Sequence, residues 1–235
     1  MTIFEQLLIV QCGLTRYRDA WELQKRIWNA RHDGVIPDVL LLTEHQHVYT
    51  LGRNTDTNHL IASSDRLKRQ EIEVIETDRG GDITYHGPGQ LIVYPILDLR
   101  RHGQDLHRYL RMLEESIILM AGKFGIAAEH DPQYTGVWVG EHKLASIGIK
   151  VSRWISMHGA AINICNDLSY FDGIIPCGIF HRDMTSVSKE VGREITIAEA
   201  GDILVTEFCS VFSYKPEAIS YEDLLRITAR EKETT

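Results

Sequence analysis

Residues 79–90 read Arg-Gly-Gly-Asp-Ile-Thr-Tyr-His-Gly-Pro-Gly-Gln, and this run carries the densest signal in the sequence. Four glycines and a proline in twelve residues are incompatible with a helix or a regular strand, so we expect a loop. Such a loop lets the backbone pass close to a ligand and point N–H groups into a concavity. The alternative is an ordinary glycine-rich surface loop. No Gly-Lys-Ser/Thr follows, which argues against a Walker-type phosphate site.

Regular elements are expected on both sides of this run. Short apolar or alternating stretches predict strands at residues 7–10, 39–42, 48–51, 72–75, 91–97, 136–139, 144–151 and 155–164. Helical periodicity predicts helices at residues 15–29 and 106–124, and the capping signals at Thr196 and Ser220 open two more. Strands with interspersed helices indicate the α+β class. The strand order does not follow from the sequence.

Three further segments are candidates for chemistry. Lys143 begins an otherwise apolar strand, where a lysine commonly extends into solvent. His158 is followed by the small residues 159–161, which either leave room for a bound chain or pack tightly. Cys177 lies between Pro176 and Gly178, which suits an exposed nucleophile beside a backbone N–H, although a buried loop cysteine is the alternative.

Length and composition limit the number of domains, the class of partner and the cellular location that the sequence allows. The chain has 235 residues, which favours one domain over residues 1–235. Its net charge of −8 argues against a nucleic-acid partner. The N-terminus lacks the pattern of a signal peptide and no stretch is apolar enough to span a membrane, so we predict a cytoplasmic protein. None of the four cysteines forms a Cys-x-x-Cys pair, which disfavours a zinc site.

Taken together, these segments resemble the lipoyl(octanoyl) transferase family, and the resemblance covers nearly the whole chain. It implies the fold of the biotin and lipoate ligase catalytic domain, which is a mixed β-sheet flanked by helices. It also implies transfer of an octanoyl group from octanoyl-acyl carrier protein to a lysine of a lipoyl domain. This reaction is the first step of protein lipoylation from endogenous fatty acid synthesis. The implied acceptors are the lipoyl domains of 2-oxoacid dehydrogenase complexes and the glycine cleavage H protein.

The resemblance also assigns roles to residues. The acyl-thioester nucleophile of the family falls on Cys177, and the lysine that lowers the pKa of that thiol, and acts as base, falls on Lys143. The substrate-binding segments of the family fall on Arg79, Gly80, Gly81, Asp82, Ile83, Thr84, Tyr85, His86, Ser146, Ile147, Gly148, His158, Gly159, Ala160 and Ala161. Because exchange from thioester to thioester to amide runs downhill, we expect no ATP and no metal.

Three rival activities remain open. An ATP-dependent lipoate or biotin ligase shares the fold but activates its acid as an adenylate and needs no nucleophilic cysteine. A non-catalytic module that binds an acyl chain or a carrier protein would keep a pocket without needing Lys143 or Cys177. A cysteine hydrolase would need a water position beside the acyl group, and no motif supports it.

Some positions depart from the family pattern. His45-Gln46-His47 stands where His-Pro-Pro is frequent, and a His-x-His pair is a possible metal ligand. Met157 and Ala160 alter the expected acyl pocket and leave the chain-length preference open.

Because the partners implied by the resemblance are acidic and this chain is net negative, we expect a local basic patch. Its candidate residues are Arg79, Lys150, Arg153 and Arg182.

Overall fold

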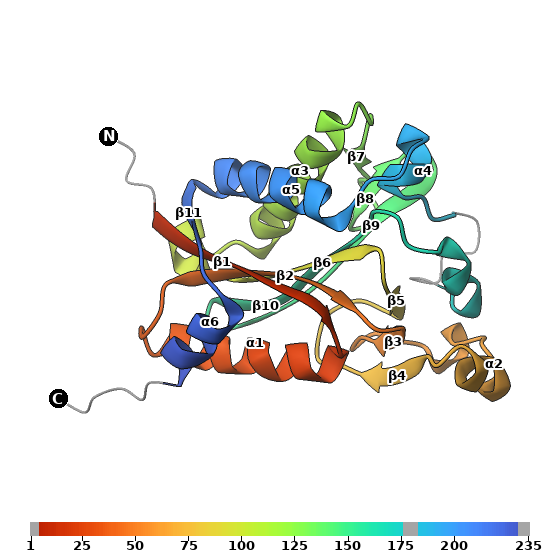
Figure 1. Cartoon of the computed structure of the whole chain (residues 1–235), viewed down its shortest axis with the longest axis horizontal. Helices are drawn as coiled ribbons and strands as arrows, with labels where there is room; N and C mark the ends of the chain where they lie inside the picture. Colours follow the sequence, from red (N-terminus) through yellow and green to blue (C-terminus); the bar gives the residue numbers. More distant parts are fainter. Residues whose placement is uncertain (1–4, 176–182, 230–235) are drawn as a thin grey trace.

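The computed structural model describes residues 5–175 and 183–229, and a mixed eight-stranded sheet forms its centre (Figure 1). The strand order is β11-β1-β2-β6-β10-β9-β8-β7. Pairing is parallel among β11, β1 and β2 and antiparallel from β2 to β7. The strands are β1 (Glu5–Thr15), β2 (Asp38–His45), β6 (Gln90–Ile96), β7 (Glu129–His130), β8 (Val137–Val139), β9 (His142–Ser152), β10 (Ile155–Asn163) and β11 (Tyr214–Ala218).

A second sheet of three strands, in the order β4-β3-β5, lies beside the large one. It comprises β3 (Val48–Leu51), β4 (Glu73–Glu76) and β5 (Thr84–His86). The presence of β5 corrects the expectation that residues 79–90 contain no regular strand. The glycines of that run cluster at 80–81 and 87–89, so the residues between them carry side chains and pair antiparallel with β3. Gln90 already belongs to β6.

Helices cover both faces of the large sheet (Figure 1). On one face lie α3 (Leu106–Lys123) and α5 (Ile197–Phe212), and on the other lie α1 (Tyr17–His32) and α6 (Tyr221–Thr228). Successive side chains of β1 point to opposite faces of the sheet, so Leu7 packs in the core with α3 and α5 and Leu8 packs in the core with α1 and α6. The short helices are α2 (Ser64–Arg69), α4 (Val187–Val191), η1 (Thr57–His59), η2 (Leu99–His102) and η3 (Leu168–Gly173).

Most expected elements are present, with shifted ends. The predicted helix at 106–124 is α3, and Thr196 caps α5 by accepting a hydrogen bond from the Glu199 N–H at 3.1 Å. The strands β7 and β11 and the helices α2 and α4 were not predicted. Among the described helices, none combines the length and apolar character that a membrane crossing requires.

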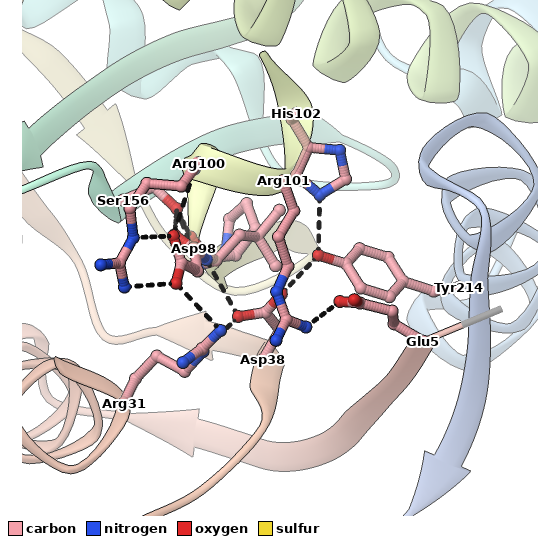
Figure 2. A network of polar contacts seen from close by, with 11 residues as sticks. Glu5, Arg31, Asp38, Asp98, Arg100, Arg101, His102, Ser156 and Tyr214 are labelled. Carbon is pink, nitrogen blue, oxygen red and sulfur yellow. Dashed lines mark hydrogen bonds and ion pairs between the residues drawn. The ribbon is translucent and has the colours of Figure 1, made fainter. Parts of the chain in front are cut away.

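A buried polar network joins the ends of several strands (Figure 2). Asp38 accepts hydrogen bonds from Arg31 and from the Tyr214 hydroxyl, each at 2.5 Å. Arg31 also reaches Asp98 at 3.3 Å. Each buried charge therefore has an opposite partner, and Tyr214 ties β11 to β2 across β1.

Candidate active site

A cavity of about 350 Å³ lies between the large sheet and the loop at residues 79–83. Its walls come from α1, the 79–83 loop, β5, β6, α3, residues 133–135, β9 and β10. The apolar part of the lining includes Ile83, Ile92, Leu110, Ile147 and Ile149. This size and mixed lining suit a small ligand with an apolar body.

The sequence segments singled out above meet at this cavity. The antiparallel pairing of β9 with β10 sets Ser146 opposite Ala161, Ile147 opposite Ala160, and Gly148 opposite Gly159. All of the expected substrate-binding residues except Tyr85 line the cavity: Arg79, Gly80, Gly81, Asp82, Ile83, Thr84, His86, Ser146, Ile147, Gly148, His158, Gly159, Ala160 and Ala161.

Tyr85 points away from the cavity. Side chains alternate along β5, so Thr84 and His86 face the cavity while Tyr85 enters a separate apolar cluster. Its hydroxyl makes a 2.8 Å hydrogen bond with Nδ1 of His47. The family motif is contiguous and therefore includes Tyr85, although strand alternation turns this side chain away from the cavity.

Arg79 is buried, with 7% of its surface exposed, and braces the cavity wall. Its Nη2 donates to the Thr50 carbonyl at 2.6 Å, and its Nη1 donates to the Gly80 carbonyl at 3.0 Å. The expected basic patch therefore cannot include Arg79. Lys150 is committed to an ion pair with Asp78, and Arg153 is exposed. Arg182 lies outside the described residues.

Neutral histidines and tyrosines form one wall of the cavity. Burial lowers the pKa of His86 well below its ordinary value, with the nearby His45 and Arg79 adding to the effect. The His86 ring stacks on Tyr17 with a centroid separation of 5.8 Å. His45 does not line the cavity but packs against this wall, with its ring centroid 5.9 Å from that of His86; burial lowers its pKa to about 4, and its Nε2 lies 2.7 Å from the Tyr94 hydroxyl. Uncharged rings suit an apolar ligand, because they add little desolvation cost.

His158 belongs to the same wall, and the carboxylate of Asp78 binds its imidazole ring. Its Nε2 lies 2.7 Å from Oδ1 of Asp78. Burial lowers the pKa of His158, whereas the hydrogen bond from His158, together with Lys150, lowers that of Asp78. We therefore assign a neutral imidazole that donates Nε2–H to a carboxylate. The next residue, Gly159, has no room for a side chain, because a Cβ would lie 2.1 Å from the Val93 carbonyl oxygen.

Lys143 is buried rather than extended into solvent, with 4% of its surface exposed, and it lines the cavity. Its Nζ lies 5.1 Å from the ring centroid of Trp138, within the range of a cation–π contact. The alternative in which this lysine reaches into solvent is therefore wrong.

Cys177 lies outside the described residues, and backbone hydrogen bonds hold the chain on either side of residues 176–182. Before it, the N–H of Ile175 donates to the His59 carbonyl at 2.8 Å. After it, the N–H of Lys143 donates to the Asp183 carbonyl at 2.9 Å, and the N–H of Thr185 donates to the Lys143 carbonyl at 3.0 Å. The backbone that follows the Cys177 segment is thus hydrogen-bonded to Lys143 itself.

The three described cysteines are poor nucleophiles. Burial raises the pKa of both Cys12 and Cys209 to about 11. Desolvation, with Glu44 and Glu194 nearby, raises the pKa of Cys165. Since the thiolate is the reactive form, none of these three is prepared for acyl transfer.

Sequence reasoning missed several residues that line the cavity. Tyr17 and Leu110 belong to helices, Tyr94 to β6, and residues 133–135 to a loop. Tyr17 was one residue in a helical pattern, and nothing local marked it as part of a site. His45 and His47 make separate hydrogen bonds, to Tyr94 and Tyr85 respectively. Across residues 5–175 and 183–229, no group of three metal-ligating side chains is found.

Comparison with known proteins identifies the family that this sequence matches. Residues 16–209 match the family described as the lipoyl protein ligase A/B catalytic domain. An octanoyltransferase of Roseiflexus sp. (strain RS-1) is 43% identical over 216 residues, which cover 91% of this chain and 90% of that protein.

Two solved structures show the same fold at low sequence identity. Lipoate-protein ligase A bound with ATP superposes with a TM-score of 0.74 at 16% identity, over 99% of this chain and 97% of that one. The biotin protein ligase of Aquifex aeolicus in complex with biotin and ATP gives 0.54 at 14% identity, over 89% and 71%. The expected mixed sheet with flanking helices, shared with biotin and lipoate ligases, is thereby confirmed. On the match over residues 16–209 and the 43% identity, this chain belongs to the lipoyl protein ligase A/B catalytic domain family.

Proposed function

We propose that this chain is an octanoyltransferase that carries the octanoyl group as a thioester on Cys177 and delivers it to a lysine of a lipoyl domain. The observation that carries the proposal is the position of Lys143. Its ammonium is buried at an apolar cavity, and its backbone is hydrogen-bonded to Asp183, six residues after Cys177 in the chain. The octanoyltransferase name of the 43% identical relative supports the same activity.

The cavity supports an acyl group as the ligand. The apolar part of its lining is aliphatic and aromatic, and burial lowers the pKa of both histidines in its wall, His86 and His158. Burying a methylene contributes about 0.8 kcal/mol, so the six methylenes of an octanoyl chain supply roughly 5 kcal/mol of gross binding free energy before ordering costs. Along β10, the small side chains of Ala160 and Ala161 line the cavity and leave space for such a chain.

In the first half-reaction, the thiolate of Cys177 attacks octanoyl-acyl carrier protein. The C–S bond to phosphopantetheine breaks, the octanoyl group moves to Cys177, and the departing thiolate takes a proton from the Lys143 ammonium, which leaves Lys143 as a neutral amine. The Lys143 ammonium favours the thiolate, because a nearby cation stabilises the charged form of an acid. This role would also explain why the chain buries a lysine at this point.

In the second half-reaction, the acceptor lysine attacks the thioester and an amide forms. Lys143, no longer facing a thiolate, takes a proton from the attacking nitrogen. We propose as acceptors the lipoyl domains of 2-oxoacid dehydrogenase complexes and the glycine cleavage H protein. The proposal treats residues 1–235 as one catalytic domain acting in the cytoplasm, without ATP or a metal.

The test is the intact mass of the protein after mixing with octanoyl-acyl carrier protein in the absence of ATP. We expect a mass gain of one octanoyl group, which is lost in Cys177→Ser, followed by loss of the label when a lipoyl domain is added. If the wild type gains no mass, or gains it only with free octanoate and ATP, the thioester proposal fails. Rapid release of free octanoate without acceptor would instead indicate a hydrolase.

A further inference from the structure

Glu114 is a buried carboxylate on the side of α3 that faces the core, and it has no role in the mechanism above. Only 2% of its surface is exposed. Its neighbours Leu113 and Ile117 belong to the core that α3 covers, and Leu110, one turn earlier, lines the cavity. A charged side chain occupies such a position only where it makes specific contacts, so its burial is informative.

Both carboxylate oxygens of Glu114 accept hydrogen bonds. Oε1 accepts the N–H of Gly136 at 3.0 Å, and this contact is buried. Oε2 accepts from Nη1 of Arg111 at 2.6 Å, and half of the Arg111 side chain remains exposed. A hydrogen bond from a backbone N–H to a carboxylate is stronger than one between neutral groups. The backbone of Gly136 is therefore fixed to α3 through Glu114.

Gly136 in turn packs against the side chain of Lys143. A Cβ built on Gly136 would lie 2.7 Å from Cε and 3.4 Å from Nζ of Lys143. Strand pairing sets Trp138 opposite Lys143, and the Trp138 ring centroid lies 5.1 Å from Nζ. Gly136 and Trp138 thus form two sides of the space through which the lysine side chain reaches the cavity.

The backbone of Lys143 is held separately from its side chain. Its N–H donates to the Asp183 carbonyl, and its carbonyl accepts the N–H of Thr185. These bonds fix where the side chain begins but not its direction, because a lysine stem is flexible. The direction depends on what packs around the stem, and Gly136 is part of that packing.

We propose that Glu114 is a positioning residue: by holding the N–H of Gly136, it sets the place of the Lys143 ammonium at the cavity wall. The consequence for catalysis rests on the proposed function. The same hydrogen bond anchors the end of residues 133–135, which line the cavity. A displacement of about 1 Å in a reacting group slows a reaction by up to about 100-fold, so a contact made through a second residue is enough to matter.

Three substitutions separate the hydrogen bond from the charge. Glu114→Gln keeps an oxygen that accepts the Gly136 N–H and loses the charge. Glu114→Asp keeps the charge and withdraws the oxygen by one methylene. Glu114→Met keeps the length of the side chain and has no oxygen. Glu115→Gln is the matched control, because Glu115 is the next residue of α3 and is exposed.

The position of the lysine is read by NMR of protein that carries ¹³C-labelled lysine. The ε-methylene signal of Lys143 is identified by its absence in Lys143→Met, and the nearby Trp138 ring shifts it. We expect this signal to stay in place in Glu114→Gln and Glu115→Gln, and to move in Glu114→Asp and Glu114→Met. This measurement requires no activity.

The consequence for catalysis is read by single-turnover loading from octanoyl-acyl carrier protein, followed by intact mass. We expect loading to be roughly 10- to 100-fold slower in Glu114→Met and Glu114→Asp, and close to wild type in Glu114→Gln. In a Lys143→Met background, Glu114→Met should cause no further loss, because the effects of two residues that act through one group are not additive.

Three results would overturn the assignment. An unmoved Lys143 signal in folded Glu114→Met would show that Glu114 does not position the lysine. Faster loading by Glu114→Asp than by Glu114→Gln would assign the effect to charge. A further loss in the Lys143→Met background would assign it to the fold. If Glu114→Met does not fold, the comparison of Gln with Asp decides the matter. If the wild-type protein does not load, the proposed function fails, whereas the NMR comparison still tests the position of Lys143.

Discussion

Gly136 leaves the space that the Lys143 side chain occupies. A Cβ at Gly136 would lie 2.7 Å from Cε of Lys143 and 2.5 Å from the Ala145 carbonyl oxygen. The φ angle of Gly136 is +133°, in a region that side chains rarely adopt. The buried lysine thus depends on a glycine seven residues earlier in the chain.

Gly136→Ala should therefore displace Lys143. We expect the rate of acyl-enzyme formation to fall at least tenfold, and the free energy of unfolding to fall by about 1–3 kcal/mol because of the strained backbone. Intact-mass kinetics and urea denaturation measure the two effects. Gly122→Ala is the control: its Cβ would meet nothing within 4 Å in the last turn of α3, and it should leave loading intact and raise stability slightly. Equal loading rates in the two variants would show that Gly136 does not position Lys143.

Removing cysteines one at a time should single out Cys177. Cys177→Ala should lose octanoyl transfer, while Cys12→Ala, Cys165→Ala and Cys209→Ala should retain most of it. Burial raises the pKa of Cys12 and Cys209 to about 11, so these thiols are almost wholly protonated at neutral pH. The measurement is the initial rate of transfer to a lipoyl domain. Substantial transfer by Cys177→Ala would end the thioester mechanism.

Lys143→Met tests the electrostatic role of the lysine. Methionine keeps much of the apolar stem and removes the ammonium, so the fold should survive. The thiolate of Cys177 should become scarcer at neutral pH, by tenfold for each unit by which its pKa rises. The midpoint of the pH profile of iodoacetamide alkylation reports this pKa. An unchanged midpoint in the folded variant would remove Lys143 from the tuning role, whatever its effect on transfer.

Stability should fall in mild acid because the histidines buried at and behind the cavity wall have lowered pKa values. Burial lowers the pKa of His45 from 6.5 to about 4, so between these values the unfolded chain binds a proton that the native state excludes. The contribution is complete above about pH 6.5 and is lost as the pH falls toward about 4. His45 alone should account for about 2 kcal/mol between pH 7 and pH 5.

The lowered pKa values of His86 and His158 act in the same direction. Urea denaturation of wild type and His45→Gln at the two pH values measures the effect, and the variant should show a weaker dependence. His32→Gln, on the surface, serves as the control and should behave as wild type. An equally steep dependence in His45→Gln would place the acid sensitivity elsewhere.

The part of the site that the sequence predicted is the part encoded in contiguous runs. Residues 79–86, 146–148 and 158–161 each carry a local pattern, and antiparallel pairing of β9 and β10 brings the last two together. Tyr17, Tyr94 and Leu110 come from single positions in ordinary helical or strand patterns, so only the packing of α1, β6 and α3 places them at the cavity. The burial of Lys143 could not be predicted for the same reason, because it depends on neighbouring elements that the sequence of its own strand does not identify.

The fold was predictable at the level of its elements and not of their order. The core strands were recognised because their apolar runs are long, whereas β11 has the sequence Tyr-Lys-Pro-Glu-Ala, which is mostly exposed and contains a proline. It pairs only along the edge of the sheet, where a proline is tolerated. Its contribution to the interior is Tyr214, whose ring packs in the core below α3 and α5 and whose hydroxyl is hydrogen-bonded to Asp38 and His102.

That edge pairing has a consequence for biosynthesis. The partners joined by β11 and β1, such as Tyr214 and Glu5, stand at opposite ends of the chain. During translation β1 emerges long before β11, and its outer edge stays open until β11 has left the ribosome. Until Tyr214 arrives, Asp38 also lacks one of its hydrogen-bond partners. An uncovered edge strand invites pairing with other nascent chains, so we expect folding of the large sheet to wait for the synthesis of β11 and to gain from chaperones that shield β1.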